Sequence, residues 1–517
     1  MSDVPVPPAR SDAAALAAEA EQPWLRLDPR MLLIHPVEEV LRLLPVLVAS
    51  VVLGSSSGNH GWGLAVAVLL VGIGVLRWFT TTYRIGPVHV ELRRGLLQRQ
   101  LLSVPRSRIR SVDVEQRLLH RLLGLAVVRL GTGQRTGAGR DRNRFELNGL
   151  AIGAVPALRD ALLGTHPGTP AEEPGVVAPA ETEVARFRPG WVRYAPFSTT
   201  GLVTVAAVVG LAFQYGLAER LGESAAVERG LSSVEATGPF VAAGFGLLVL
   251  VVVASLVACV RYVLLYADLS VTDDGRMLRV GHGLLRHRHT TLDRRRLRGV
   301  SLREPLALRL VGGARLDAVM TGVAAEHGES SLLLPPAPSA EARRVAAAVL
   351  RDTRQLDAPL RAHGPAARRR RFTRALLPVA LAVAAAAATV AVTGRTVPVA
   401  AWIPVVAVVA TGAVGLAWDR YRSLGHAVLG AGTADAPAWL ITRGGSLDRR
   451  RVSLEADGII GWTVRQSFFQ RRAGVATVVA ATPAGTGRYE VVDLPAEQAW
   501  ALVEAVTPGA GDAWVRR

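Results

Sequence analysis

The sequence predicts a polytopic α-helical membrane protein that carries three β-rich domains, each closed by a helix. Three observations lead to this fold class. Six apolar segments form three close pairs, a basic and strand-like stretch follows each pair, and the three stretches share one register of residues. The repeat decides the architecture, because internal similarity indicates copies of one structural unit.

Composition supports a membrane protein and excludes an ordinary soluble enzyme. Half of the 517 residues are hydrophobic, and the mean hydropathy is +0.29. The formal net charge is +18. Arginine-rich loops enforce membrane topology and attract anionic lipid headgroups. We predict no nucleic-acid partner, because the basic stretches alternate with membrane segments. The single cysteine, Cys259, lies in an apolar run, which excludes an intrachain disulfide.

The helices are predicted where the chain is apolar over the length that a bilayer requires, about 20 residues. The six segments are Val40–Leu53, Gly61–Phe79, Thr199–Leu217, Phe240–Val263, Ala375–Val392 and Val397–Trp418. Gln214 is the only strongly polar side chain deep in one of them, and no Asp, Glu or His lies well inside any. Ion-coupled transporters usually need buried ionisable groups, so this pattern disfavours that class.

The charge of the connecting segments predicts the orientation. Connectors within the pairs are poor in arginine, whereas the stretches between pairs are rich in it, most of all at Arg368–Arg371. Cytoplasmic segments collect such positive charge. We therefore predict a multi-pass protein of the plasma membrane, with both termini and all three β-rich domains in the cytoplasm. Residues 1–23 lack the features of a signal peptide and are expected to be a disordered tail.

The clearest repeated stretch combines a polar residue, an apolar turn and a glycine in one register. It occupies Gln116–Val128, Glu304–Leu316 and Gln466–Val478, and the shared glycines are Gly124, Gly312 and Gly474. This pattern suits a strand, a short amphipathic turn and a bend into the next strand. Valine in place of Gly124 or Gly474 is therefore expected to destabilise its own domain.

The pattern resembles the bacterial PH-like domain of the YdbS/YdbT type. The three-copy arrangement, with a helix pair before each copy, resembles the YdbT-like membrane proteins. The resemblance covers most of the chain from Trp24 onward, including Trp24–Pro29 and Trp191–Phe197 beside the membrane. The second copy departs most, with Pro305 inside the repeated stretch. The resemblance implies a PH-like fold, a bent β-sandwich closed by one helix, and no particular activity.

The helix pairs and the repeat together predict the domain boundaries. PH-like domains are expected at residues 80–166, 264–353 and 419–508. The segments with the helix pairs precede them at residues 24–79, 187–263 and 372–418. The remaining segments are the tail 1–23, a linker at 167–186, a basic linker at 354–371 and the tail 509–517.

A search for chemistry finds no catalytic, cofactor-binding or metal-binding residues, and we predict that the protein is not an enzyme. The histidines His282, His287 and His289 would need more ligands than Asp273 and Asp274 to hold a metal ion. The glycine-rich stretch Gly131–Gly137 lacks the lysine of a phosphate-binding loop and does not open a helix.

Two arginine runs are the remaining candidates for a binding role. Arg294–Arg296 and Arg449–Arg451 could grip phosphate oxygens, although a solvated cytoplasmic face is the expected interpretation. The sequence as a whole favours a non-enzymatic binding scaffold at the inner face of the plasma membrane, with an envelope-related role. Its predicted partners are the lipid bilayer, through anionic headgroups, and an unidentified protein, with another PH-like membrane protein as the candidate. A transporter or export accessory component is the alternative.

Overall fold

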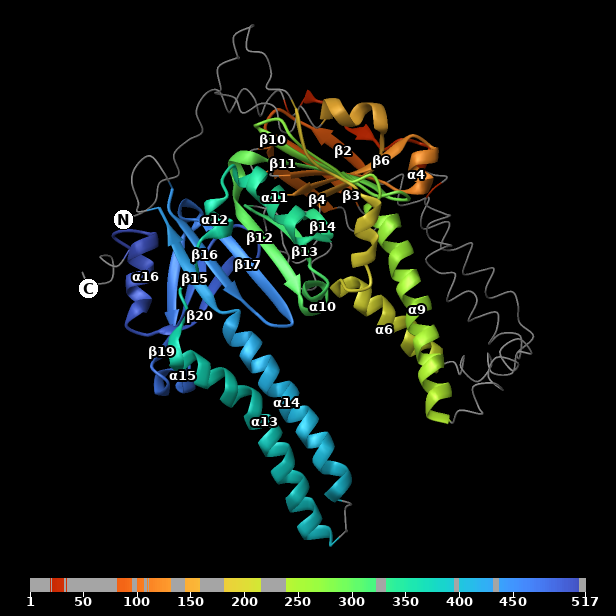
Figure 1. Cartoon of the computed structure of the whole chain (residues 1–517). Helices are drawn as coiled ribbons and strands as arrows, with labels where there is room; N and C mark the ends of the chain where they lie inside the picture. The colour runs from red at the N-terminus through yellow and green to blue at the C-terminus, as the bar shows by residue number, and fades with distance from the viewer. Residues whose placement is uncertain are drawn as a thin grey trace. The chain divides into compact units, whose positions relative to one another are not determined.

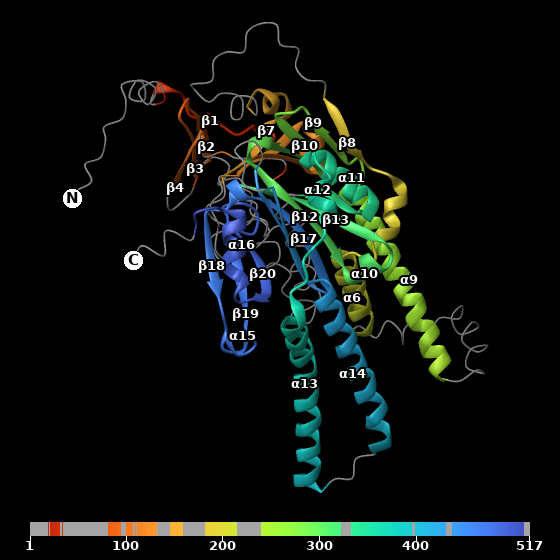
Figure 2. The same ribbon diagram turned by 60° about the vertical axis from the view of Figure 1, so that its left-hand side comes forward.

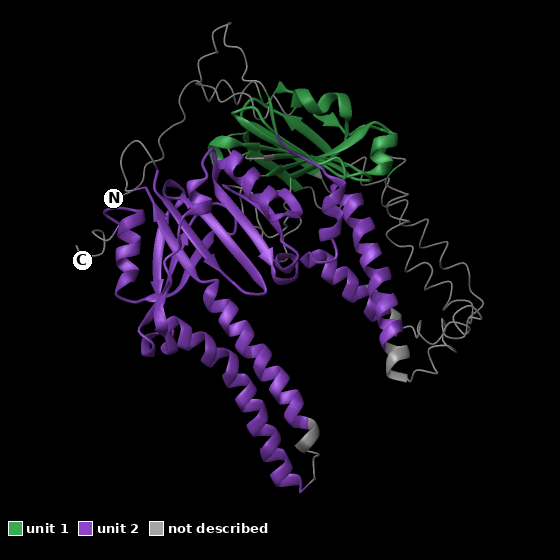
Figure 3. Cartoon of the chain, in the orientation of Figure 1, with its two compact units in different colours: residues 1–183, 267–296, 322–324 green, residues 184–266, 297–321, 325–517 purple. Residues whose placement is uncertain are grey.

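A computed structural model describes the chain in two compact units (Figures 1 and 3). The first unit contains residues 1–183, 267–296 and 322–324, and the second contains residues 184–266, 297–321 and 325–517. The described residues are 19, 21–31, 34, 81–94, 100–106, 109, 111–131, 145–158, 181–214, 239–321, 332–394, 399–430 and 437–510. The predicted first helix pair, most of the predicted N-terminal tail and the glycine-rich stretch after Gly131 lie outside them.

The first unit begins with a sheet of four antiparallel strands in the order β1-β2-β3-β4. These strands are β1 (Leu25–Arg26), β2 (Thr82–Ile85), β3 (His89–Arg94) and β4 (Gln100–Pro105). The core of the unit collects apolar residues from this sheet and from the strands that follow, among them Val90, Leu92 and Val128. Alternate residues of β3 are buried, as expected for strands with one face on a core.

The second sheet of this unit combines strands from two repeats. The strands are β5 (Ser111–Gln116), β6 (Leu125–Gly131) and β7 (Phe145–Ala151), followed along the chain by β9 (Ser270–Asp273), β10 (Met277–His282) and β11 (His287–Asp293). Their order is β7-β6-β5-β11-β10-β9, and β8 (Thr182–Arg186) follows β9. The sheet is continuous because β5 pairs with β11.

The second unit repeats this construction. Its six-stranded sheet has the order β14-β13-β12-β17-β16-β15. The strands are β12 (Leu297–Pro305), β13 (Gly313–Met320), β14 (Leu332–Pro338), β15 (Gly425–Leu429), β16 (Trp439–Gly444) and β17 (Asp448–Glu455). Figure 1 shows β12 beside β17, where strands β12 to β14 join strands β15 to β17 in one sheet. A three-stranded sheet of β18 (Gly461–Arg465), β19 (Val475–Ala481) and β20 (Arg488–Pro495) completes the unit.

Short helices stand where the repeat predicts an apolar turn. They are α4 (Leu118–Leu122), α10 (Leu306–Leu310) and α15 (Phe468–Arg472). Closing helices follow the last strands of the second and third repeats, α11 (Ser339–Leu350) and α16 (Gln498–Val506). In the first repeat the short helix η3 (Ile152–Ala154) follows β7. Both closing helices bury one apolar stripe, as surface helices of globular domains do.

Each shared glycine has a left-handed backbone conformation. The φ angles are +69° at Gly124, +74° at Gly312 and +65° at Gly474, so the predicted bend is present in all three repeats.

We expect Gly474→Val to lower the free energy of unfolding by about 1–2 kcal/mol, because a β-branched residue is strained at positive φ. Thermal unfolding of the detergent-solubilised chain measures this. Gly474→Asn should lose less, because asparagine tolerates this conformation. Equal losses in the two variants would contradict the explanation.

Within the described residues, three helices are long and apolar enough to cross a membrane, by length and composition. They are α9 (Pro239–Tyr266), α13 (Gly364–Thr393) and α14 (Val399–Arg422), and α6 (Thr199–Gln214) is a shorter apolar helix beside α9. Figures 1 and 2 both show α13 and α14 side by side. The short helices η4 (Pro189–Tyr194) and α12 (Arg354–Asp357) precede these pairs. Part of the predicted basic linker is helical, since α13 begins at Gly364 and contains Arg368–Arg371.

Candidate anion-binding site

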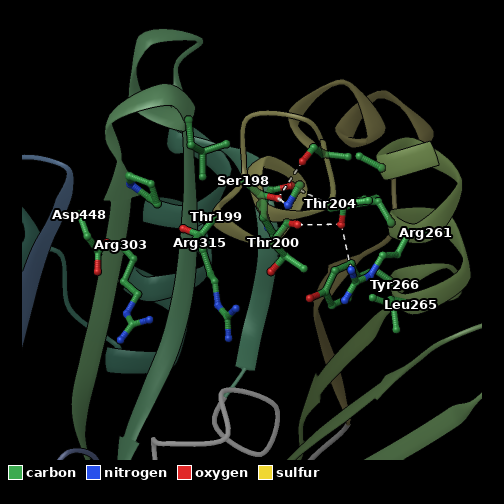
Figure 4. Close-up of a pocket in the computed structure, with 17 residues that line it drawn as sticks. Ser198, Thr199, Thr200, Thr204, Arg261, Leu265, Tyr266, Arg303, Arg315 and Asp448 are labelled. Atoms are coloured by element: carbon green, nitrogen blue, oxygen red, sulfur yellow. Dashed lines mark hydrogen bonds between the residues drawn. The ribbon is translucent and has the colours of Figure 1, made fainter. Parts of the chain in front are cut away.

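A cavity of about 310 Å³ lies in the second unit, between the ends of α6 and α9 and the strands β12 and β13. Figure 4 shows Arg303 and Arg315 on neighbouring strands, across the cavity from Arg261 on α9. The other polar groups on its wall are those of Ser198, Thr199, Thr200, Thr204, Tyr262, Tyr266 and Asp448. Three arginines therefore face one lining carboxylate, in a volume at the lower end of the range for small-ligand pockets.

The start of α6 forms the helical wall of the cavity. The hydroxyl of Ser198 accepts a hydrogen bond from the Gly201 amide at 2.9 Å, so it caps this helix. Gly201 allows the tight entry, because a Cβ atom there would lie 1.8 Å from the carbonyl oxygen of Ala195. Arg261 donates to the Thr204 hydroxyl at 2.9 Å, which fixes its guanidinium toward α6. The first amides of a helix favour a negative charge nearby.

The strand wall brings like charges together. Arg303 on β12 lies directly opposite Arg315 on β13 and, on its other side, opposite Arg450 on β17. Directly opposed like charges destabilise a sheet. The carboxylate of Asp317 compensates in part, at 3.0 Å from Arg315 and 3.7 Å from Arg303. Burial, followed by the charge of Arg450, lowers the pKa of Arg303 from its ordinary value. An anion in the cavity would relieve this repulsion.

The geometry suits an anion with several oxygens rather than a metal ion. Guanidinium groups donate to phosphate and carboxylate oxygens, and the hydroxyls of Thr199 and Thr200 on the cavity wall can donate as well. The hydroxyls of Ser198 and Thr204 already donate to the carbonyls of Ala195 and Thr200. Within the described part of the chain, no three His, Cys, Asp or Glu residues are grouped as a metal site. His287 and His289 lie on β11 with stacked rings 6.4 Å apart.

The arginine runs singled out in the sequence are engaged within the fold. Arg294 pairs with Asp273 at 2.5 Å, and Arg449 donates to Glu304 at 2.6 Å. Arg451 donates to the backbone of Gln355 and Ala358, and burial lowers its pKa to about 10. The expectation of a freely solvated face is therefore wrong for these three residues. The sequence alone favours a surface position for each of them, but the fold pairs them with carboxylates and carbonyls.

The third run is anchored in the same way. Arg370 and Arg371, in the first turns of α13, both pair with Asp493 on β20, and the distance from Arg371 is 2.8 Å. Asp493 is 0% exposed and also accepts a hydrogen bond from Gln470 on α15. This cluster attaches the long apolar helix α13 to the last sheet of the same unit.

The sequence profile of the bacterial PH domain family matches residues 39–165 and 377–508, which together make up half of the chain. The chain belongs to the bacterial PH domain family. Each matched region extends from the predicted membrane segments to the end of a repeat. No curated protein and no solved structure gives a significant match. The cavity draws all its lining residues except Asp448 from the stretch between the two matched regions.

Sequence reasoning missed the three arginines that line the cavity, because none of them belongs to a run. Arg303 and Arg315 meet only through strand pairing. Arg261 carried a signal, since it is the only charged residue in the 28 residues of α9. An ionisable residue in an apolar helix is a reason to look for a functional site.

Proposed function

We propose that the chain is a non-enzymatic binding scaffold anchored in the plasma membrane, and that its cavity holds the phosphate of an anionic lipid headgroup. In this proposal the protein is of the three-copy YdbT-like type, with both termini and its PH-like domains in the cytoplasm. Its role is envelope-related. The observation that carries the proposal is the pairing of Arg303 with Arg315 at the membrane-helix ends.

The position of the cavity supports a lipid as the source of the phosphate. Arg261, Tyr262 and Tyr266 occupy the last turns of α9, a helix long and apolar enough to span a bilayer. Tyrosine and arginine at the end of such a helix are typical of the headgroup region. An anionic headgroup would therefore reach the cavity from the membrane surface, and α6 would direct its first amides toward it.

The test compares lipid retention by the full chain and by the double variant Arg303→Gln/Arg315→Gln. Both proteins are reconstituted with phosphatidylcholine and a minor fraction of phosphatidylglycerol, extracted, and analysed by native mass spectrometry. We expect the unmodified chain to retain phosphatidylglycerol selectively. An arginine near anionic lipid contributes about 1 kcal/mol to binding, so the double variant should lose the contribution of two arginines. Its selectivity for phosphatidylglycerol should therefore be roughly 30-fold lower.

A matched control is available in the same unit. The double variant Arg354→Gln/Arg488→Gln removes the same charge from side chains that are 81% and 72% exposed. It should retain the selectivity of the unmodified chain. An equal decrease in both double variants would show a general charge effect, and no decrease in either would refute the cavity as the lipid site.

A further inference from the structure

Neighbouring repeats are joined twice by the same strand pairing. β11 pairs antiparallel with β5, with Leu292 opposite Ser111, and β17 pairs antiparallel with β12, with Leu454 opposite Gly299. The repeat register aligns Leu292 with Leu454, and Ser111 with Gly299. Both joints therefore use equivalent strands in one register, although they lie in different units. Each repeat is therefore joined to the next by the same pair of strands in the same register.

Side chains reinforce each joint. In the first, Arg288 pairs with Asp113 at 3.2 Å and Arg286 with Glu115 at 2.5 Å. Burial alone would raise the pKa of Glu115, but hydrogen bonding to Arg286 and the charge of Arg129 outweigh it and lower the pKa to about 2. In the second joint, Arg449 pairs with Glu304, and Arg298 pairs with Glu455 at 2.9 Å.

Two strands that correspond to those of the joints have no described partner strand on one edge. β4 is the counterpart of β11 and β17, and β18 is the counterpart of β5 and β12. Each is the outermost strand of its sheet, and no described strand pairs with its outer edge (Figure 2). The Arg106 amide donates to the Val88 carbonyl on the β3 side at 2.8 Å. By antiparallel alternation, the amides of Leu101 and Ser103 then face outward.

The residues on the two edges complement each other. The common register would set Val104 opposite Gly461, Leu101 opposite Val464, and Pro105 opposite Ile460. In the second joint, the residues that correspond to Pro105 and Ile460 are Glu455 and Arg298, and they form an ion pair. The free edges instead carry an apolar residue on both sides, and Ile460 and Leu101 are 74% and 54% exposed. Exposed apolar edge strands are templates for pairing with another chain.

We propose that β18 of one copy of this chain pairs antiparallel with β4 of a second copy, in the register of the two internal joints. The contact is heterologous, because the two edges differ. Every copy offers one edge of each kind, so assembly continues head to tail into a ring or a filament. This assignment is independent of the lipid proposed for the cavity.

The test uses one engineered disulfide. Gln100 and Arg465 would face each other as a non-hydrogen-bonded pair, with Cα atoms about 4.5 Å apart, within the range of a disulfide. Both side chains are exposed, so neither substitution disturbs a core. Cys259→Ala removes the single native cysteine. The full chain with Gln100→Cys and Arg465→Cys is oxidised in detergent or native vesicles. We expect a ladder of linked species that extends beyond the dimer.

Two further measurements make the test decisive. Mixing a tagged Gln100→Cys chain with a differently tagged Arg465→Cys chain should yield a linked dimer that carries both tags. As a control, Gln100→Cys is combined with Arg488→Cys, which lies on β20 and not on the strand proposed to pair with β4. The yield of linked chains should be at least tenfold lower than with Arg465→Cys. Adding Leu101→Lys, a charge on the free edge, should reduce the linked yield at least tenfold. A disulfide confined to single chains, a yield no higher than the control, or no effect of Leu101→Lys would overturn the proposal.

Discussion

Asp493→Asn is expected to lower the free energy of unfolding of the full chain by about 3–5 kcal/mol, the cost of leaving a buried charge unpaired. The substitution preserves size and a side chain that tolerates positive φ, which is +59° at this residue. It removes the carboxylate that two arginines share, and their side chains are only 12% and 10% exposed.

Thermal unfolding in detergent measures the effect, and the same strand supplies a control. Glu490 pairs with Arg465 at 2.9 Å, with side-chain exposures of 28% and 55%. Exposed ion pairs contribute about 0–1 kcal/mol, so Glu490→Gln should change stability little. Adding Arg371→Gln to Asp493→Asn should recover part of the loss, because one unpaired charge is removed. Additive losses in that double variant would contradict the shared-carboxylate explanation.

Local features of this chain were predictable from the sequence, and the pairing of its strands was not. Hydropathy predicted the position of the long apolar helices among the described residues, as in Phe240–Val263 against the observed α9, because apolar length is a local property. The bends at Gly124, Gly312 and Gly474 were predictable for the same reason. Alternation along a strand shows which face is buried but does not identify the neighbouring strand. The pairing of β5 with β11 therefore required the structure.

The candidate site shows the same difference between local sequence features and strand pairing. Arginine runs are visible in the sequence, yet the structure engages them in ion pairs within the sheets. The cavity arginines are isolated along the chain and gather through strand register. Opposition of Arg303 and Arg315 depends on which residues of β12 and β13 face each other, and a slip of one residue would separate them. A single sequence does not specify that register here, because α10, and not a two-residue hairpin turn, joins the two strands.

Acidification is expected to destabilise the second unit through a buried histidine pair. His363 donates from Nδ1 to the Val492 carbonyl at 2.8 Å, so its neutral Nε2 accepts the Nδ1 proton of His426 at 3.0 Å. Burial, then the charges of His363 and Arg361, lower the pKa of His426 from 6.5 to about 4. Burial likewise lowers the pKa of His363, although the Val492 carbonyl and Asp493 oppose the change.

The sign of the effect follows from proton uptake. Between pH 6.5 and pH 4 the unfolded chain binds a proton at His426 that the folded chain does not, so stability falls as the pH falls. At about 1.4 kcal/mol per pKa unit, the loss between neutral pH and pH 4 is roughly 3 kcal/mol. His426→Asn keeps a donor for His363 and cannot titrate, so its melting temperature should depend less on pH over this range. If the chain and His426→Asn had parallel profiles, the histidine pair would not be the titrating element.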